Sequence, residues 1–138
     1  MTYALDSNTI SYMIRNEGNT LKNFTLEIVE HGNHYAIPFI VTHEVKRWLL
    51  YKPTKAAKEY INKFNALFTS VKTRAEMSEF VWHKATEIYI LLKSRGQLIC
   101  NSDILIAAYC LANDYTLVTR NIGDFKRIDG LKYVNWFE

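Results

Sequence analysis

Short apolar segments alternate with longer amphipathic segments along this chain, and that alternation is the strongest constraint on its fold. Strands are expected at TYAL (2–5), HYAI (34–37), YTLVT (115–119) and, at an edge, YVNWF (133–137). Helices are expected over 8–16, 19–32, 38–51, 54–68, 75–96 and 102–114, with an extended segment at 69–73. Strands that alternate with helices predict an α/β fold with a mainly parallel sheet.

Length and composition set the number of domains. The chain has 138 residues, of which 49% are hydrophobic and 14% aromatic, enough for one core. We find no repeat, low-complexity segment or linker, so one domain is expected over residues 1–138.

Charge and sulfur chemistry exclude several classes of protein. A formal net charge of +3 permits a polyanionic partner but is far below that of a protein that binds nucleic acid by charge alone. Neither the two cysteines nor the four histidines show the spacing of a zinc site, and the cysteines are expected to be reduced thiols. Because the N-terminus lacks a leader pattern and no apolar run is long enough to span a membrane, the cytoplasm is the expected location.

Four acidic residues stand where acids need an explanation. Asp6 follows the first strand, at the edge where an open parallel sheet binds ligands, although an aspartate before a helix is also an ordinary cap. Glu44 lies in line with Ile40, Val41 and Trp48, on the face of its helix that we expect to be buried. A carboxylate there needs a salt bridge, a hydrogen-bond donor or a metal ion.

The other two acids belong to the last third of the chain. Asp103 begins a helix that is apolar nearly all round, where the helix dipole favours an acid. Asp124 follows it by 124 − 103 = 21 residues, a span that holds one helix, one strand and a turn and so returns to the same sheet edge. Converging carboxylates repel one another unless a hard cation such as Mg²⁺ or Mn²⁺ neutralises them. The implied chemistry is metal-assisted phosphodiester hydrolysis.

At these acids the sequence resembles the PIN-domain family of metal-dependent ribonucleases, especially the VapC-type toxins of toxin-antitoxin modules. The matching motifs are LDSNTIS, IPFIVTHEVKRWLL, SDILIAAYCLANDYTLVTRNIGDFKRIDGL and VNW, which run the length of the chain. The third motif is the most specific, because so long an ordered pattern of residues seldom arises by chance.

The resemblance implies a role for each site residue. Asp6, Glu44 and Asp103 would form the metal centre, and Asp124 would join them as a fourth carboxylate. The neighbouring polar residues would order the ligands or their waters or brace the first loop: Thr119, Asn121, Ser7 and Asn8. Trp48 stands where many relatives carry glycine, and Asn121 is neutral where some carry an acid, so the number of metal ions stays open.

The resemblance also implies a Rossmann-like sheet flanked by helices, a homodimer, Mg²⁺ or Mn²⁺ dependence and cleavage of tRNA or ribosomal RNA. A cognate antitoxin would inhibit the protein, in part through the helices at 38–51 and 54–68. Aromatic residues at helical spacing there are interpreted as core or interface: Trp48, Tyr51, Tyr60, Phe64 and Phe68. Candidate phosphate contacts, each equally compatible with a solvated surface, are Lys46, Arg47, Arg120, Lys126 and Arg127.

Two other functions compete with a nuclease. A receiver domain also places acids and Mg²⁺ at the edge of a parallel sheet, but it needs paired acids after the first strand and a lysine after a later one. Here Asp6 is single and Arg120 follows Thr119. A PIN fold that binds RNA or protein without cutting would be expected to lack some of the carboxylates, and all four are present.

Overall fold

The structure is a computed structural model that describes residues 1–51, 54–68, 74–75 and 77–138. Its strands form one sheet in the order β3-β2-β1-β4-β5, and every neighbouring pair is parallel. The strands are β1 (Thr2–Leu5), β2 (His34–Pro38), β3 (Arg74–Ala75), β4 (Thr116–Val118) and β5 (Tyr133–Val134). The predicted α/β fold with a parallel sheet is confirmed.

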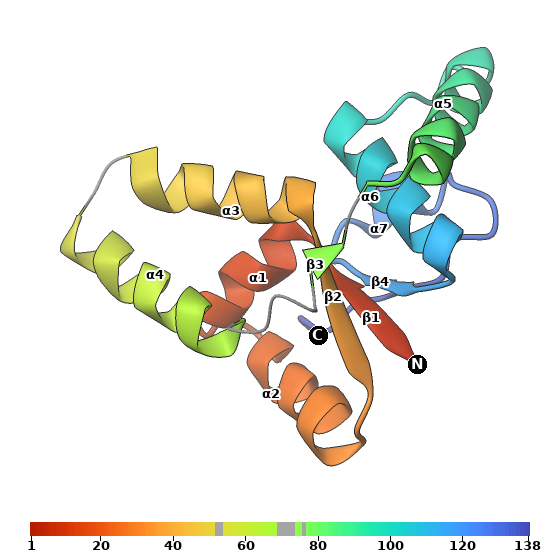
Figure 1. Cartoon of the computed structure of the whole chain (residues 1–138). Helices are drawn as coiled ribbons and strands as arrows, with labels where there is room; N and C mark the ends of the chain where they lie inside the picture. Colours follow the sequence, from red (N-terminus) through yellow and green to blue (C-terminus); the bar gives the residue numbers. More distant parts are fainter. Residues whose placement is uncertain (52–53, 69–73, 76) are drawn as a thin grey trace.

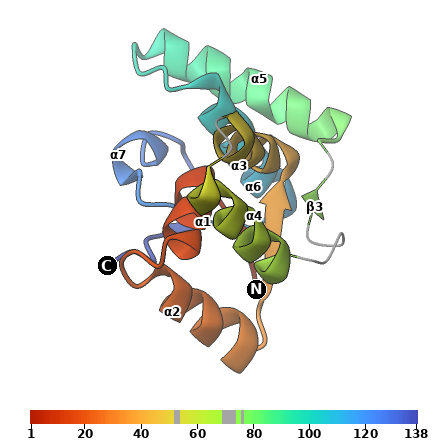
Figure 2. The same cartoon turned by 90° about the vertical axis from the view of Figure 1, so that its left-hand side faces the viewer.

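Helices cover both faces of this sheet (Figure 1). They are α1 (Ser7–Ile14), α2 (Thr20–Phe24), the π-helical continuation η1 (Thr25–Glu30), α3 (Phe39–Tyr51), α4 (Lys55–Leu67), α5 (Glu79–Ser94), α6 (Asn101–Asn113) and α7 (Ile122–Phe125). In Figure 1, α1 to α4 lie on one side of the sheet and α5 and α6 on the other. The α3–α4 hairpin extends away from the sheet and points toward the viewer in Figure 2. Within the described ranges, no helix has both the length and the apolar character that a membrane crossing requires.

The strand order reverses direction at β1. The chain passes from β1 to β2 on one side, whereas β4 pairs with the other edge of β1, with Leu5 beside Val118. In a parallel sheet such a switch point leaves a crevice outside the carboxyl ends of the two strands. Asp6 follows β1 and Thr119 follows β4, so both residues lie at this crevice, where the Asp6 amide donates to the Val118 carbonyl at 3.3 Å.

One hydrophobic core fixes the elements around the crevice. The central strands are buried on both faces, as Leu5 and Leu117 show with no exposed surface. Helix α6 is buried along Ile104–Cys110, which confirms the helix that the sequence predicts to be apolar nearly all round. Edge-to-face and tilted rings join the end of α4 to α2 and β2: Phe24, Tyr35, Phe64 and Phe68.

Two predicted boundaries differ from the structure by more than two residues. The helix expected from residue 75 begins at Glu79, because the side chain of Ser78 caps it by accepting from the Val81 amide, and Arg74–Ala75 pair with β2 instead. The strand expected over 133–137 ends at Val134. The extended segment expected at 69–73 lies outside the described residues. Helix α7 (Ile122–Phe125) was not predicted, because four residues carry too little periodicity to indicate a helix.

Ile10 tests the packing of α1 on the sheet. Its side chain is fully buried, so Ile10→Val should lower the free energy of unfolding by about 0.5–1.5 kcal/mol, the usual cost of one lost methyl group. The control is Val29→Ala in η1, where the residue is 70% exposed and the change should alter the free energy of unfolding by no more than about 0.5 kcal/mol. Urea denaturation of both variants measures the difference, and equal losses would contradict this packing.

Candidate functional site

Asp6 is the most buried of the four acids. Only 5% of the residue is exposed, and its carboxylate accepts from the Thr9 amide at 2.8 Å, which caps α1. Burial raises the pKa of Asp6, hydrogen bonds from Thr119 and Thr9 lower it, and the charge of Glu44 raises it further. Asp6 is therefore the helix cap that the sequence allows, but a cap alone does not require a buried carboxylate.

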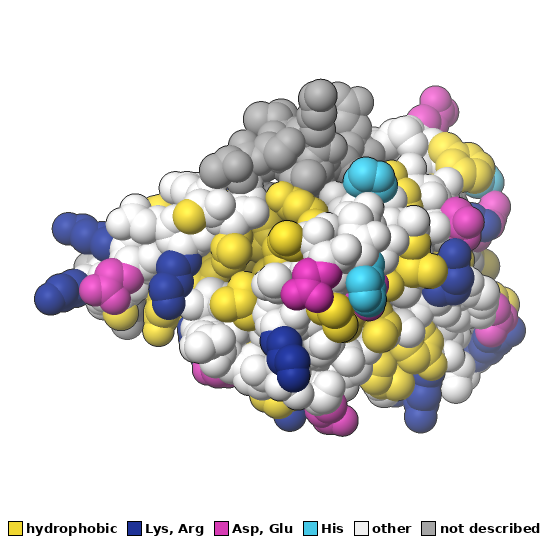
Figure 3. Space-filling model, turned by 90° about the horizontal axis from the view of Figure 1, so that it is seen from below, with side chains coloured by type: hydrophobic (Ala, Val, Ile, Leu, Met, Phe, Trp, Pro, Cys, Tyr) yellow, Lys and Arg dark blue, Asp and Glu magenta, His cyan; other side chains and the backbone are white. Residues whose placement is uncertain are grey.

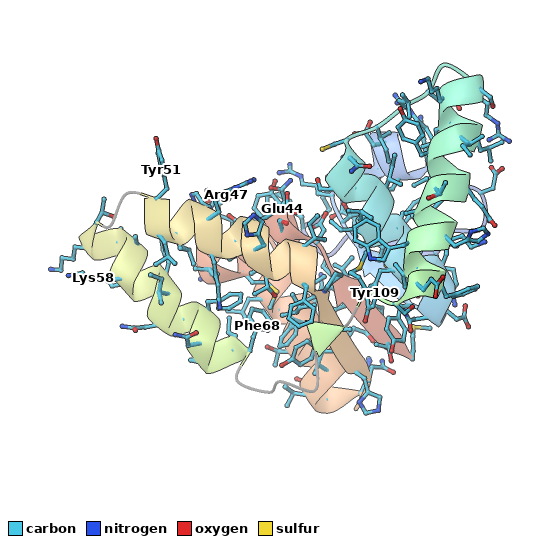
Figure 4. The ribbon with its side chains drawn as sticks, turned by 45° about the horizontal axis from the view of Figure 1, so that its top comes forward. Glu44, Arg47, Tyr51, Lys58, Phe68 and Tyr109 are labelled. Atoms are coloured by element: carbon cyan, nitrogen blue, oxygen red, sulfur yellow. The ribbon has the colours of Figure 1, made fainter. Side chains whose placement is uncertain are left out.

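Glu44 lies on α3 (Figure 4), and its charge acts on Asp6. The Ser7 hydroxyl donates to its Oε1 at 2.7 Å, and among the residues described no lysine or arginine pairs with it. The predicted buried face of this helix is confirmed at Val41, Val45 and Leu49. It is wrong at Trp48, which is 45% exposed, and Glu44 is half-buried. Trp48 stacks instead on Tyr60 of α4, with ring centroids 6.0 Å apart. Glu44 thus lies at the edge of the buried face, within reach of solvent.

The charges of all three other acids affect the pKa of Asp103. It lies in the first turn of α6, half-buried. Burial, followed by the charges of Asp6, Glu44 and Asp124, raises its pKa to about 6. These charges act on Asp103 because α1, α3, α6 and α7 bring their acids to one place. The sequence prediction that the four carboxylates converge is consistent with this geometry.

Polar residues after β4 link Asp124 to Asp6. The Asn121 side-chain amide donates to Asp124 Oδ2 at 3.0 Å, and the Asn121 backbone amide donates to Thr119 Oγ1, also at 3.0 Å. Thr119 is buried and in turn hydrogen-bonds Asp6. The short loop between β4 and α7 thereby holds both carboxylates in a fixed relation.

Thr9 is a site residue that sequence reasoning missed. Besides the contact from its amide to Asp6, its hydroxyl donates to the Val118 carbonyl at 3.0 Å, which fastens α1 to the end of β4. The sequence could have indicated the first contact, because a capping aspartate usually accepts from the amide two or three residues later. The hydroxyl contact joins residues 109 positions apart, and no sequence pattern indicates it. Asn8 is exposed, and in the described part of the chain its side chain makes no hydrogen bond.

The donor set fits a hydrated hard cation. All four side chains offer carboxylate oxygens, the ligands that Mg²⁺ and Mn²⁺ prefer. Within the described ranges, no three Asp, Glu, His or Cys side chains are placed so that they could hold a metal ion together. Mg²⁺ keeps several waters and binds through one or two carboxylates, so a looser ring of acids suits it. The buried Asp6 and the raised pKa of Asp103 both indicate that negative charge there lacks compensation from the protein.

The candidate phosphate contacts come from two parts of the chain, α3 and the segment that follows β4. On the face seen from below, Lys and Arg side chains are interspersed with acidic and hydrophobic ones, so that face offers no continuous basic surface (Figure 3). Arg47, three residues after Glu44, neighbours it on α3. Lys46 and Arg47 both line a hollow with Phe39 and Leu50.

The basic residues after β4 differ among themselves. Arg127 lies 3.9 Å from Asp124 and donates to the Gln97 carbonyl at 3.4 Å, so it is already engaged. Lys126 is exposed. Arg120 is exposed and lies over the ring of Phe137, 3.7 Å from its centroid. Of the five candidates, only Arg127 pairs with a carboxylate in the described residues.

Comparison with known proteins adds relatives over the whole length. The family model described as "PIN domain" matches residues 3–131. Ribonuclease VapC2 of Rickettsia felis is 34% identical over 137 residues, which cover 99% of this chain and 98% of that protein. Ribonuclease VapC2 of Haemophilus influenzae is 28% identical, with the same coverage of 99% and 98%. The crystal structure of VapBC2 from Rickettsia felis bound to a DNA fragment from its promoter is similar with a TM-score of 0.83, 30% identity and 99% coverage of both chains.

Proposed function

Because this chain belongs to the PIN-domain family and is related to VapC ribonucleases over its full length, we propose that it is a metal-dependent endoribonuclease. One observation carries the proposal: the charges of Asp6, Glu44 and Asp124 all act on Asp103 at the carboxyl edge of the sheet. In metal-assisted phosphodiester hydrolysis, a cation stabilises the negative charge that develops on the phosphate, and the carboxylates at this edge could bind that cation.

The residues divide into metal ligands and residues that orient them. Asp6, Glu44, Asp103 and Asp124 would hold Mg²⁺ or Mn²⁺, directly or through water. A bound ion supplies an activated water and neutralises charge on the scissile phosphate. Around the ligands, Ser7 orients Glu44, Asn121 orients Asp124, and Thr9 and Thr119 orient Asp6.

The relatives also suggest which partners this chain binds. The related Rickettsia felis structure is of VapBC2 on promoter DNA, which supports a toxin that a cognate antitoxin neutralises. We propose tRNA or ribosomal RNA as the substrate. We also propose one domain over residues 1–138, since the chain covers 98% of its relative. A homodimer is supported by exposed apolar side chains on α5, namely Phe80, Trp82, Tyr89, Ile90 and Leu91.

Ser7 gives the proposal a sensitive test. Ser7→Ala removes the 2.7 Å hydrogen bond that orients Glu44. Because the carboxylate is then no longer held in place, apparent metal affinity should fall about tenfold, the low end of the losses seen when a residue that orients a ligand is removed. The measurement is the Mn²⁺ concentration that gives half-maximal cleavage. Ser94→Ala is the control, because that hydroxyl donates to the Leu91 carbonyl at the end of α5. An unchanged Mn²⁺ requirement in Ser7→Ala would argue against Glu44 as a ligand.

The experiment that tests the function is cleavage of end-labelled tRNA and ribosomal RNA by purified protein in Mg²⁺, in Mn²⁺ and in chelator. Discrete products that need metal are expected, and they identify the substrate class. Metal binding without cleavage of either RNA would instead favour a PIN fold that only binds.

A further inference from the structure

Two arginines and three aromatic rings from distant parts of the chain contact one another in a row. We call this set the aromatic–arginine strip: Trp48, Arg15, Tyr12, Phe137 and Arg120. The Arg15 guanidinium lies 5.8 Å from the Trp48 ring centroid and 5.7 Å from that of Tyr12. Tyr12 meets Phe137 edge to face at 4.8 Å, and Arg120 lies 3.7 Å over Phe137. Segments from four parts of the chain thus build one continuous surface.

Three of the four segments that carry the strip also carry a residue of the site. Trp48 is four residues after Glu44 on α3, one helical turn of about 5.4 Å away on the same face. Tyr12 belongs to α1, which begins with Ser7, the donor to Glu44. Arg120 directly follows Thr119, which hydrogen-bonds Asp6. A chain bound along the strip would therefore pass next to the carboxylates.

Phe137 is held in place by its surroundings. Its carbonyl accepts from the Asn19 amide at 2.8 Å, and its amide donates to Asn135 Oδ1 at 2.9 Å. Gly18 has φ +60°, and a Cβ there would lie 2.6 Å from the Phe137 carbonyl oxygen, so only glycine allows this approach. The ring is a fixed platform that holds the Arg120 guanidinium.

The chemistry of the strip favours nucleic acid. Arg120 is exposed, and in the part of the chain that the structure describes no carboxylate pairs with it. Such an arginine offers donors to a phosphate and a flat face to a base, and exposed rings such as Trp48 take part in the same stacking. Only unpaired bases have faces free to stack, because a duplex keeps them between neighbours.

From these contacts we propose that the aromatic–arginine strip binds an unpaired RNA segment and leads it to the carboxylates. The proposal rests on the proposed nuclease function and narrows its substrate to RNA that is single-stranded at the cleaved site. Arg120 contacts a phosphate and a base, Phe137 positions Arg120, and Trp48 stacks a second base.

The test measures binding apart from cleavage. In an Asp6→Asn background with chelator, fluorescence anisotropy gives the affinity for a labelled oligouridine and for a duplex of the same length. Arg120→Gln and Trp48→Leu should each weaken oligouridine binding about tenfold, within the range for one lost base stack. The duplex should bind more weakly than the single strand. Arg120→Gln should also reduce the slope of log affinity against log salt by about 0.7, the value for one phosphate on a single strand.

Lys93→Gln is the matched control. Lys93 also lies over an aromatic ring, 5.7 Å from the centroid of Tyr89, but on α5 outside the strip. It loses the same charge and should bind oligouridine as the parent does. Phe137→Leu is a second test that keeps the charge: if Phe137 positions Arg120, binding weakens while the salt slope stays unchanged. Thermal denaturation confirms that each variant folds.

The outcomes separate this inference from the function on which it rests. Equal affinities for Arg120→Gln and Lys93→Gln would overturn the strip. So would normal RNA binding combined with weakened binding of a purified antitoxin, which would assign the surface to a protein partner. Strip-dependent RNA binding in a wild-type protein that cuts no RNA would support the strip and count against the nuclease.

Discussion

Asp6→Asn is expected to lower the rate of RNA cleavage by roughly 10³-fold, which corresponds to the several kcal/mol that a metal centre contributes. The substitution removes one charge from the most buried carboxylate of the site and adds no volume. Asparagine is as good a helix cap as aspartate, so α1 should still begin after residue 6. Cleavage of one end-labelled RNA at saturating Mn²⁺ measures the loss.

Asp114→Asn is the matched control for that loss. It makes the same chemical change at the C-terminal end of α6, away from the site. There the aspartate side chain is 90% exposed and pairs with Lys132. Its left-handed conformation, with φ 56°, suits asparagine equally well. Cleavage by this variant should match the wild type. Full activity of Asp6→Asn would remove Asp6 from the site.

Asp103→Asn is expected to have two effects of opposite sign. Cleavage should fall by roughly 10²-fold or more, because a ligand charge is lost. The metal-free protein should become more stable at pH 7 by about 1–2 kcal/mol, after allowance for solvent screening. The gain arises because folding brings Asp103 into the low-dielectric surroundings and like charges that raise its pKa to about 6.

The sign of the pH dependence follows from that raised pKa. Between the ordinary pKa of 3.8 and the folded value of about 6, the folded protein binds more protons at Asp103 than the unfolded chain does. The contribution of Asp103 to stability is therefore lost as pH rises through this window. In chelator, the melting temperature of the wild type relative to that of Asp103→Asn should fall between pH 4 and pH 7. A variant that is less stable than the wild type at pH 7 would contradict the clustering.

The acids at strand and helix ends could be predicted from sequence because local pattern determines where those elements end. Asp6 follows a strand of four residues, and Asp103 begins a helix that is apolar on nearly every side. In a parallel sheet, these two facts place both acids at one edge. The hydrogen-bonding roles of Thr119 and Asn121 remain predictions that the geometry supports.

Contacts between distant segments could not be predicted in the same way. The hydrophobic pattern placed Trp48 on a buried face, but α4 covers only part of α3 and leaves that ring 45% exposed. The stacking of Arg120 on Phe137 depends on a C-terminal segment that Gly18 and Asn19 hold in place. One sequence shows neither contact, because each joins residues that no local period relates.

Isothermal titration of Mn²⁺ into wild-type protein, Asp103→Asn and Asp114→Asn tests most directly whether the four carboxylates form a metal centre. Saturable binding should occur in the wild type and in Asp114→Asn and should be weakened at least tenfold in Asp103→Asn, the low end for losses even among residues that only orient ligands. Equal binding by all three proteins would contradict the account, because the ion would then be held elsewhere.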